Sequence, residues 1–257
     1  MPVVSFAIQK GGTGKTTSTV MVSATLAREG NKVLLMDLDP QASATQCLTE
    51  NHDFDFTVAD LLLGKVKDSD KVIYEQRNIP NLFYIPSSME LLMLEYKGQL
   101  AGIAPDVVKH FIKPLLNSFD YIICDCPPSL NHYMKNALWA SDYLIIPVEP
   151  EPLSYDGTKQ LIGEILPEIQ QSNPKLKLGG VLIKHRSNAL RKWLPEQIRG
   201  RLDTIRNGIR FQNEIRVDQE LAKMAVKHSP ACVYSSKSTG VEDYYVVTQE
   251  FIQRTKS

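Results

Sequence analysis

QKGGTGKTT, residues 9 to 17, is the stretch of sequence on which the fold depends. It follows an apolar run, VVSFAI at 3 to 8, and it leads into residues 16 to 29, which are compatible with a helix that closes at Gly30. A strand, a glycine cluster and a helix in this order bring backbone N–H groups and the positive end of the helix together, where they can wrap a chain of phosphates. The sequence therefore predicts a phosphate-binding loop.

The residue types in this loop suit that chemistry. Its glycines carry no β-carbon that would obstruct a close approach, Lys15 can reach the β- and γ-phosphates, and the Thr16 hydroxyl can ligate Mg2+. Thr17 can contact the α-phosphate. A turn that only links a strand to a helix is the alternative, but the strand and helix context favours phosphate binding. The predicted nucleotide contacts are Lys10, Gly11, Gly12, Thr13, Gly14, Lys15, Thr16 and Thr17.

Apolar runs and helical segments alternate along the rest of the chain. The runs are VLLMD at 33 to 37, LFYIP at 82 to 86, YIICDCPP at 121 to 128, YLIIPVEP at 143 to 150 and LGGVLIK at 178 to 184. Helical spacing covers 90 to 100, 106 to 117, 154 to 171 and 190 to 202, whereas 49 to 81 are typical of a surface excursion. This alternation predicts an α/β fold: a doubly wound, mostly parallel sheet with helices on both faces, in a single domain over residues 1–257.

Composition excludes several classes of protein. The 257 residues are 43% apolar, which is enough for a sizeable core, and Lys plus Arg equal Asp plus Glu at 29 each. The four cysteines show no spacing typical of a disulfide scaffold or a metal cluster, and no apolar stretch approaches the roughly 18 residues that a membrane helix needs. We therefore expect a cytoplasmic protein with no stable membrane anchor.

Three aspartates follow apolar runs at positions where parallel strands end. Asp37 and Asp39 close the run that begins at 33, and Asp125 closes YIIC. Because carboxyl ends of parallel strands face ligands in open α/β sheets, these side chains are candidates for a site beside the loop. Strand-ending turns are the alternative for each aspartate taken alone, and the combination with the loop favours the site.

Three motifs carry a resemblance to a known family. The general phosphate-loop pattern is not met strictly, since Gln9 stands five positions before Gly14, but a second lysine, Lys10, precedes the paired glycines. This K-G-G-x-G-K-[ST] loop resembles that of the ParA/MinD superfamily, whose Walker A motif is deviant. DLDPQ at 37 to 41 and DCPPS at 125 to 129 resemble its D-x-D-P-Q switch and hydrophobic-D-x-P-P motifs. The chain is most similar to the compact ParA/Soj type.

This resemblance implies an ATPase that uses ATP and Mg2+ and forms a homodimer when ATP is bound. It implies catalytic roles for three residues: Lys10 would reach the nucleotide of the partner subunit, Lys15 would hold the phosphates, and Asp39 would orient the attacking water. Asp37 and Asp125 would support Mg2+ through water, together with Thr16. Hydrolysis would be weak alone and stimulated by a partner.

Basic residues gather in one segment of this chain, whose overall net charge is zero. From 184 to 216 there are nine Lys or Arg residues against three acidic ones, a segregation suited to holding a phosphate backbone. A solvated helical face is the alternative, and the resemblance favours sequence-independent DNA binding with a nucleoid-associated location. The candidate contacts are Arg186, Arg191, Lys192, Arg199, Arg201, Arg206, Arg210 and Arg216.

Other members of the superfamily suggest different partners and functions. ParA-like proteins work with a ParB-like or adaptor protein to position plasmids, chromosomes or protein bodies, and the sequence does not identify the cargo. MinD relies on a basic amphipathic terminal helix, whereas Tyr244, Val247 and Phe251 here predict a helix docked on the domain, with acidic neighbours that disfavour anionic lipid. The nitrogenase iron protein shares the loop but holds a cluster, and the cysteine spacing argues against that.

Overall fold

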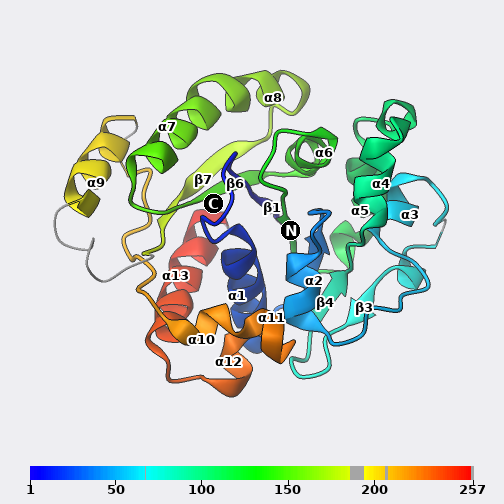
Figure 1. Ribbon diagram of the computed structural model, residues 1–257, viewed down its shortest axis with the longest axis horizontal. Coiled ribbons are helices and arrows are strands. Elements are labelled where there is room, and N and C mark those ends of the chain that lie inside the picture. The colour runs from blue at the N-terminus through cyan, green and yellow to red at the C-terminus, as the bar shows by residue number, and fades with distance from the viewer. Residues whose placement is uncertain (67, 186–193, 206–207, 256–257) are drawn as a thin grey trace.

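A mostly parallel sheet forms the centre of the protein. The computed structural model describes residues 1–66, 68–185, 194–205 and 208–255 (Figure 1). Within them, seven strands pair in the order β3-β4-β2-β5-β1-β6-β7, and only the edge strand β3 is antiparallel to its neighbour. The strands are β1 (Val3–Phe6), β2 (Val33–Asp37), β3 (Tyr74–Glu75), β4 (Leu82–Ile85), β5 (Tyr121–Asp125), β6 (Tyr143–Val148) and β7 (Lys177–Ile183).

The central strands read as continuous apolar runs because the sheet is buried on both faces. Alternate residues of one strand enter different cores, since successive side chains in a strand point to opposite faces. In β2, for example, Leu34 and Met36 belong to one core, whereas Val33 and Leu35 belong to the other. The doubly wound α/β fold predicted from the alternating runs is confirmed.

Helices cover both faces of this sheet (Figure 1). α1 and α13 pack side by side on one face, and α5, α6, α7 and α8 cover the other. The helices are α1 (Lys15–Arg28), α2 (Ser43–Leu48), α3 (Val58–Leu62), α4 (Glu90–Tyr96), α5 (Val107–Ile112), α6 (His132–Ala140), α7 (Pro152–Gln160), α8 (Leu166–Ser172), α9 (Leu194–Ile205), α10 (Gln219–Ala222), α11 (Met224–Lys227), α12 (Ala231–Tyr234) and α13 (Thr239–Thr255). Short 3-10 turns are η1 (Ser69–Lys71), η2 (Gln99–Gly102) and η3 (Lys113–Asn117), and a π-helical turn, η4 (Leu161–Ile165), joins α7 to α8.

Two regions refine the sequence-based expectations. The segment 49–81 is more than a surface excursion, because α3 buries Val58 and Leu61 in the core and β3 extends the sheet. At the chain's end, α13 buries Tyr244, Val247 and Phe251 against the face that carries α1, so the predicted docked helix is confirmed. Among the described residues, no helix is both long and apolar enough to cross a bilayer.

Candidate functional site

The sheet topology brings three loops to one edge. β2, β5 and β1 are neighbours, and their parallel register pairs Asp37 with Asp125 and Phe6 with Asp125. Each pair lies at the carboxyl ends of its strands, so the loop that follows β1 emerges directly beside both aspartates. This edge of the sheet is the candidate functional site, in the place where open α/β sheets hold ligands.

Glycines allow the loop after β1 to turn sharply into α1. Gly12 has a φ of 79° and Gly14 a φ of 88°, conformations that side chains with a β-carbon rarely adopt. Gly14 is the N-cap of α1, and its carbonyl accepts the first helical hydrogen bond from the Ser18 N–H at 2.9 Å. The N–H groups of the first helical turn therefore remain available to an anion, as the sequence predicts.

Lys15 is buried in the middle of this loop, with a relative exposure of 6%. Its Nζ donates to the Lys10 carbonyl oxygen at 2.8 Å. Burial lowers the pKa of Lys15, although the nearby carboxylates of Asp125 and Asp39 oppose that shift. A largely desolvated ammonium with few fixed partners is a strong binding group for phosphate, because an incoming anion meets little competing water.

Lys10 is held by residues of the same chain. Its Nζ forms an ion pair with Glu151 and lies 3.2 Å from the Ser154 hydroxyl, and both partners lie at the start of α7. The side chain is a quarter exposed, at 24%, so it remains accessible from solvent. The residue-10 amine thus has an anionic partner within the same chain.

Asp125 is completely buried and contacts α1. The Thr16 hydroxyl donates to its Oδ2 at 2.8 Å, and the Thr19 hydroxyl lies 3.1 Å from its Oδ1. Burial raises the pKa of Asp125 well above its ordinary value, and the charge of Asp37 adds to that rise. The structure therefore places the predicted Thr16 and Asp125 together, one hydrogen bond apart.

Asp37 is also fully buried and is held by the start of α2. The Thr45 N–H and hydroxyl both donate to its Oδ2 at 2.8 Å, and the Asp39 N–H donates to Oδ1 at 3.1 Å. Burial raises the pKa of Asp37 to about 7, and these hydrogen bonds limit the rise. The carboxyl group is thus fixed in orientation but costly to ionise without a cation nearby.

Asp39 begins a tightly held turn beside the loop. Its Oδ1 accepts the Gln41 N–H at 2.9 Å, and its carbonyl oxygen accepts a hydrogen bond from the Ser87 hydroxyl at 2.6 Å. Burial raises the pKa of Asp39, while the Gln41 N–H and the charge of Lys15 oppose the rise. Next in the turn, Ala42 has a φ of 52°, a left-handed conformation that is uncommon without glycine and that concentrates at functional segments.

The residues at this edge fit a nucleotide with Mg2+. The Thr13 hydroxyl is buried and has no hydrogen-bond partner in the described part of the chain, an arrangement that a bound phosphate would complete. No group of three potential metal ligands from His, Cys, Asp and Glu occurs among the described residues. Mg2+ needs no such cage, because it binds through one or two carboxylates, water and the phosphates of its substrate.

The buried carboxyl group of Asp37 predicts a pH dependence of stability without nucleotide. A pKa raised from 3.8 to about 7 favours the folded state while Asp37 is protonated, and that advantage is lost as pH rises from about 4 through about 7. We expect the free energy of unfolding to fall by on the order of 3 kcal/mol over this window, with Asp125 and Asp39 acting in the same direction.

Urea unfolding at pH 5 and pH 8 measures this difference. Asp37→Asn should remove much of the slope, whereas Asp70→Asn, at an exposed carboxylate of η1, should leave it unchanged. Glu214 does not interfere: although burial alone would raise its pKa, hydrogen bonds from Arg199 and His185 hold it at about 2, so its contribution is lost only below this window. A slope equal to that of the native protein in Asp37→Asn would contradict the assignment.

The structure describes half of the predicted DNA contacts. Arg186, Arg191, Lys192 and Arg206 lie outside the described residues. Arg199, Arg210 and Arg216 line one hollow of about 480 Å³, and each forms a two-pronged ion pair, with Glu214, Asp203 and Asp243 respectively. Arg201 is exposed, and its guanidinium lies over the ring of Tyr155. Internal ion pairs thus offset part of the positive charge that the sequence concentrates here.

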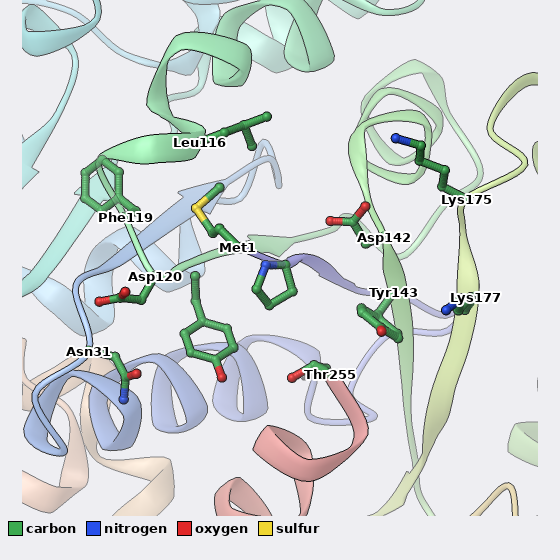
Figure 2. Close-up of a pocket in the computed structure, with 12 residues that line it drawn as sticks. Met1, Asn31, Leu116, Phe119, Asp120, Asp142, Tyr143, Lys175, Lys177 and Thr255 are labelled. Atoms are coloured by element: carbon green, nitrogen blue, oxygen red, sulfur yellow. The ribbon is translucent and has the colours of Figure 1, made fainter. Parts of the chain in front are cut away.

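A separate hollow of about 740 Å³ opens at the opposite, amino edge of the sheet (Figure 2). Asp120 and Asp142, which precede β5 and β6, line it together with Met1 and Thr255 (Figure 2). Asp142 accepts a hydrogen bond from the Val3 N–H at 2.9 Å. None of the residues predicted for the nucleotide site lines this hollow, so it does not belong to that site.

Several residues that shape the site were not predicted. Thr45 orients Asp37, Ser87 anchors the turn at Asp39, and Glu151 and Ser154 hold Lys10. The position of Glu151 could have indicated a role, because it follows β6 at the same edge of the sheet. Thr45 and Ser87 had no comparable signal, since polar residues of this type are common in helices and loops.

Comparison with known proteins agrees with the geometry. A family model described as "AAA domain" matches residues 1–178. The sporulation initiation inhibitor protein Soj of Bacillus subtilis is 32% identical over 254 residues, covering 96% of this chain and 97% of Soj. The chromosome partitioning protein ParA of Myxococcus xanthus is 30% identical over 259 residues, covering 98% of this chain and 88% of that relative.

A solved structure extends the comparison. Cobyrinic acid a,c-diamide synthase from Mycobacterium smegmatis, crystallised with an ATP analogue and magnesium, superposes with a TM-score of 0.81 at 27% identity and covers 100% of this chain and 96% of its own. The matched family model, the relatives that span nearly the whole chain and the loop geometry agree. The chain belongs to the AAA domain family, in its ParA/MinD branch of ATPases.

Proposed function

We propose that this protein is an ATP-dependent switch that binds Mg2+ and ATP at the carboxyl edge of its sheet and hydrolyses the γ-phosphate. One observation carries the proposal: Lys15, Thr16 and the buried pair Asp37 and Asp125 converge beside a glycine loop at the start of a helix. The protein of known structure with a bound ATP analogue and magnesium supports the choice of ligand.

Different residues of the site would bind the phosphates, hold Mg2+ and orient the attacking water. The loop from Lys10 to Thr17 would hold the phosphates, and Lys15 would carry the charge of the β- and γ-phosphates. Thr16, Asp37 and Asp125 would hold Mg2+, with the aspartates acting through water, and the ion would neutralise charge on the phosphates. Asp39 would orient the attacking water, because its turn is fixed by Gln41 and Ser87.

Lys10 would act across a homodimer interface, on the nucleotide of the partner subunit. In this chain its amine pairs with Glu151. On dimer formation Lys10 would leave this carboxylate for the more highly charged triphosphate, and this second cation would offset charge that develops during hydrolysis. This change of partner by Lys10 would couple the bound nucleotide to dimer formation.

The cellular role proposed is positioning. Residues 1–257 would act as one nucleotide-binding domain whose ATP-bound dimer binds DNA without sequence preference, in the cytoplasm and on the nucleoid. A ParB-like or adaptor protein would stimulate a weak ATPase and release the dimer. The name of the chromosome partitioning protein ParA, a relative of this chain, supports this role, and the burial of α13 against the core disfavours the membrane alternative.

DNA binding can be tested at a described arginine. Arg201 is exposed on α9, so Arg201→Ala should remove one phosphate contact, weaken nonspecific duplex binding by a few-fold and reduce the slope of log affinity against log salt by about one. Fluorescence anisotropy with a labelled duplex, ATP and Mg2+ measures both quantities. Arg77→Ala is the matched control, because Arg77 is exposed beside β3, at the opposite end of the molecule from α9 (Figure 1).

Two results would overturn the DNA assignment. One is an ATP-loaded dimer that shows no salt-dependent affinity for DNA. The other is binding to anionic vesicles at the same salt without binding to DNA, which would favour membrane association instead. An equal loss of DNA affinity in Arg77→Ala and Arg201→Ala would show that the contact surface does not centre on α9.

A further inference from the structure

A lysine outside the recognised motifs lies across the phosphate loop. A β-carbon at Gly14 would overlap Cδ of Lys184 and would lie 3.1 Å from its Cε and 3.5 Å from its Nζ. The aliphatic stem of Lys184 therefore packs directly on Gly14, and its ammonium group ends beside the loop. A larger side chain at this position would have to displace Lys184, in addition to adopting the φ of 88°.

The backbone on both sides fixes the place of Lys184. It directly follows β7, and its N–H donates to the Val148 carbonyl oxygen of β6 at 2.8 Å. On the other side it forms a parallel bridge with Ile215. A lysine held between two extended segments reaches the loop from a rigid base, so its approach to Gly14 follows from the sheet rather than from a mobile connection.

The strand alternation determines which face Lys184 shares. Leu182, two residues earlier in β7, belongs to the core that α1 covers, whereas Val181 and Ile183 belong to the opposite core. Because side chains alternate, Lys184 points to the same face as Leu182, toward the N-terminal end of α1. Gly14 is the N-cap of that helix, which explains why the two residues meet.

We propose that Lys184 is a third lysine of the nucleotide site and binds the phosphate chain of a nucleoside di- or triphosphate at its α and β groups. The inference rests on the proposed ATP-binding function. Loop N–H groups next to Gly14 cradle these two phosphates, while Lys15 extends toward the β and γ groups. A primary ammonium offers three donors on a flexible stem, which suits contact with a phosphate oxygen that lies over the loop.

This placement predicts a specific pattern of affinities. Lys184→Met keeps most of the apolar stem but removes the charge, and a charge-assisted hydrogen bond is worth about 1.5 to 3 kcal/mol. The dissociation constants of ADP and ATP should therefore both rise by about tenfold to a hundredfold, by similar factors. Lys184→Arg keeps the charge and should retain most of the affinity. Titration calorimetry with each nucleotide and Mg2+ measures these constants.

Matched controls separate the charge from general damage. Lys175→Met removes an exposed lysine that precedes the other end of β7 and should leave both affinities unchanged. Thermal melts without nucleotide show whether each variant is folded, and Lys184→Gln provides a second neutral variant if Lys184→Met is not. The ligand-induced rise in melting temperature gives an independent measure of affinity.

The possible outcomes are distinguishable. Equal losses for ADP and ATP in Lys184→Met, with recovery in Lys184→Arg, support the proposal. Native affinity for both nucleotides overturns it, and a loss for ATP alone overturns the placement at the α and β groups. If the native protein itself binds neither nucleotide, the proposed function fails, whereas native binding with an unaffected Lys184→Met variant refutes only this inference.

Discussion

Lys15→Ala should abolish measurable nucleotide binding. The Lys15 ammonium is buried at the centre of the loop, where the proposed function places the β- and γ-phosphates, so its loss should remove at least two charge-assisted contacts. At about 1.5 to 3 kcal/mol for each contact, the affinity for ATP should fall by roughly two to four orders of magnitude. Calorimetry with ATP and Mg2+ at pH 7.5 measures this loss.

The variant should remain folded without nucleotide. Burial already lowers the pKa of Lys15, which means that the folded protein disfavours its charge, so removing that charge should not cost much stability. Lys15→Met preserves more of the packed stem and should show the same loss of binding, whereas Lys109→Ala, an exposed lysine on α5, should bind ATP as the native protein does. Near-native affinity in Lys15→Met would contradict the assigned role.

Asp39→Ala should bind ATP but hydrolyse it at least about a hundredfold more slowly, as expected when a group that positions or activates a nucleophile is lost. Because dimers are proposed to separate only after hydrolysis, this variant should accumulate as an ATP-bound dimer. Light scattering during gel filtration with ATP and Mg2+ measures the dimer, and phosphate release measures the rate. Hydrolysis at the native rate would refute the water-positioning role.

Asp39→Asn separates chemistry from local structure. The Asp39 side chain also accepts the Gln41 N–H at 2.9 Å, so alanine removes a hydrogen bond that shapes the turn. Asparagine keeps an acceptor for that N–H but provides no carboxylate for a water proton. If Asp39→Asn is as slow as Asp39→Ala, the chemical role is supported. If it recovers native turnover, the side chain acts mainly on the turn.

The phosphate loop was predictable because its determinants are contiguous. The glycines that need positive φ, the lysine and the threonine lie within nine residues, and their order between a strand and a helix already implies an anion site. The three aspartates were predictable for a related reason. Apolar runs identify buried strands, and the ends of parallel strands meet at one edge, as Asp37 and Asp125 do.

The side chains that pair with or contact the loop come from residues far away in the sequence. Glu151, which pairs with Lys10, and Lys184, which crosses Gly14, are separated from the loop by more than a hundred residues of sequence. Helical or strand periodicity contains no information about contacts between residues so far apart in the sequence. The same limit applies to the arginines, because net charge along a segment cannot show that Arg216 is paired with Asp243 of α13.

By itself, then, the sequence determined the doubly wound fold, the ATPase family and the glycine loop that is proposed to bind phosphate, since each follows from local pattern and residue type. Tertiary structure alone decided which partners hold the functional side chains: Thr45 on Asp37, Glu151 on Lys10 and Lys184 on Gly14. The physical reason is that local periodicity specifies strands and helices, whereas ionisation and side-chain orientation depend on burial and contacts created only when the β6 and β7 ends pack beside the loop.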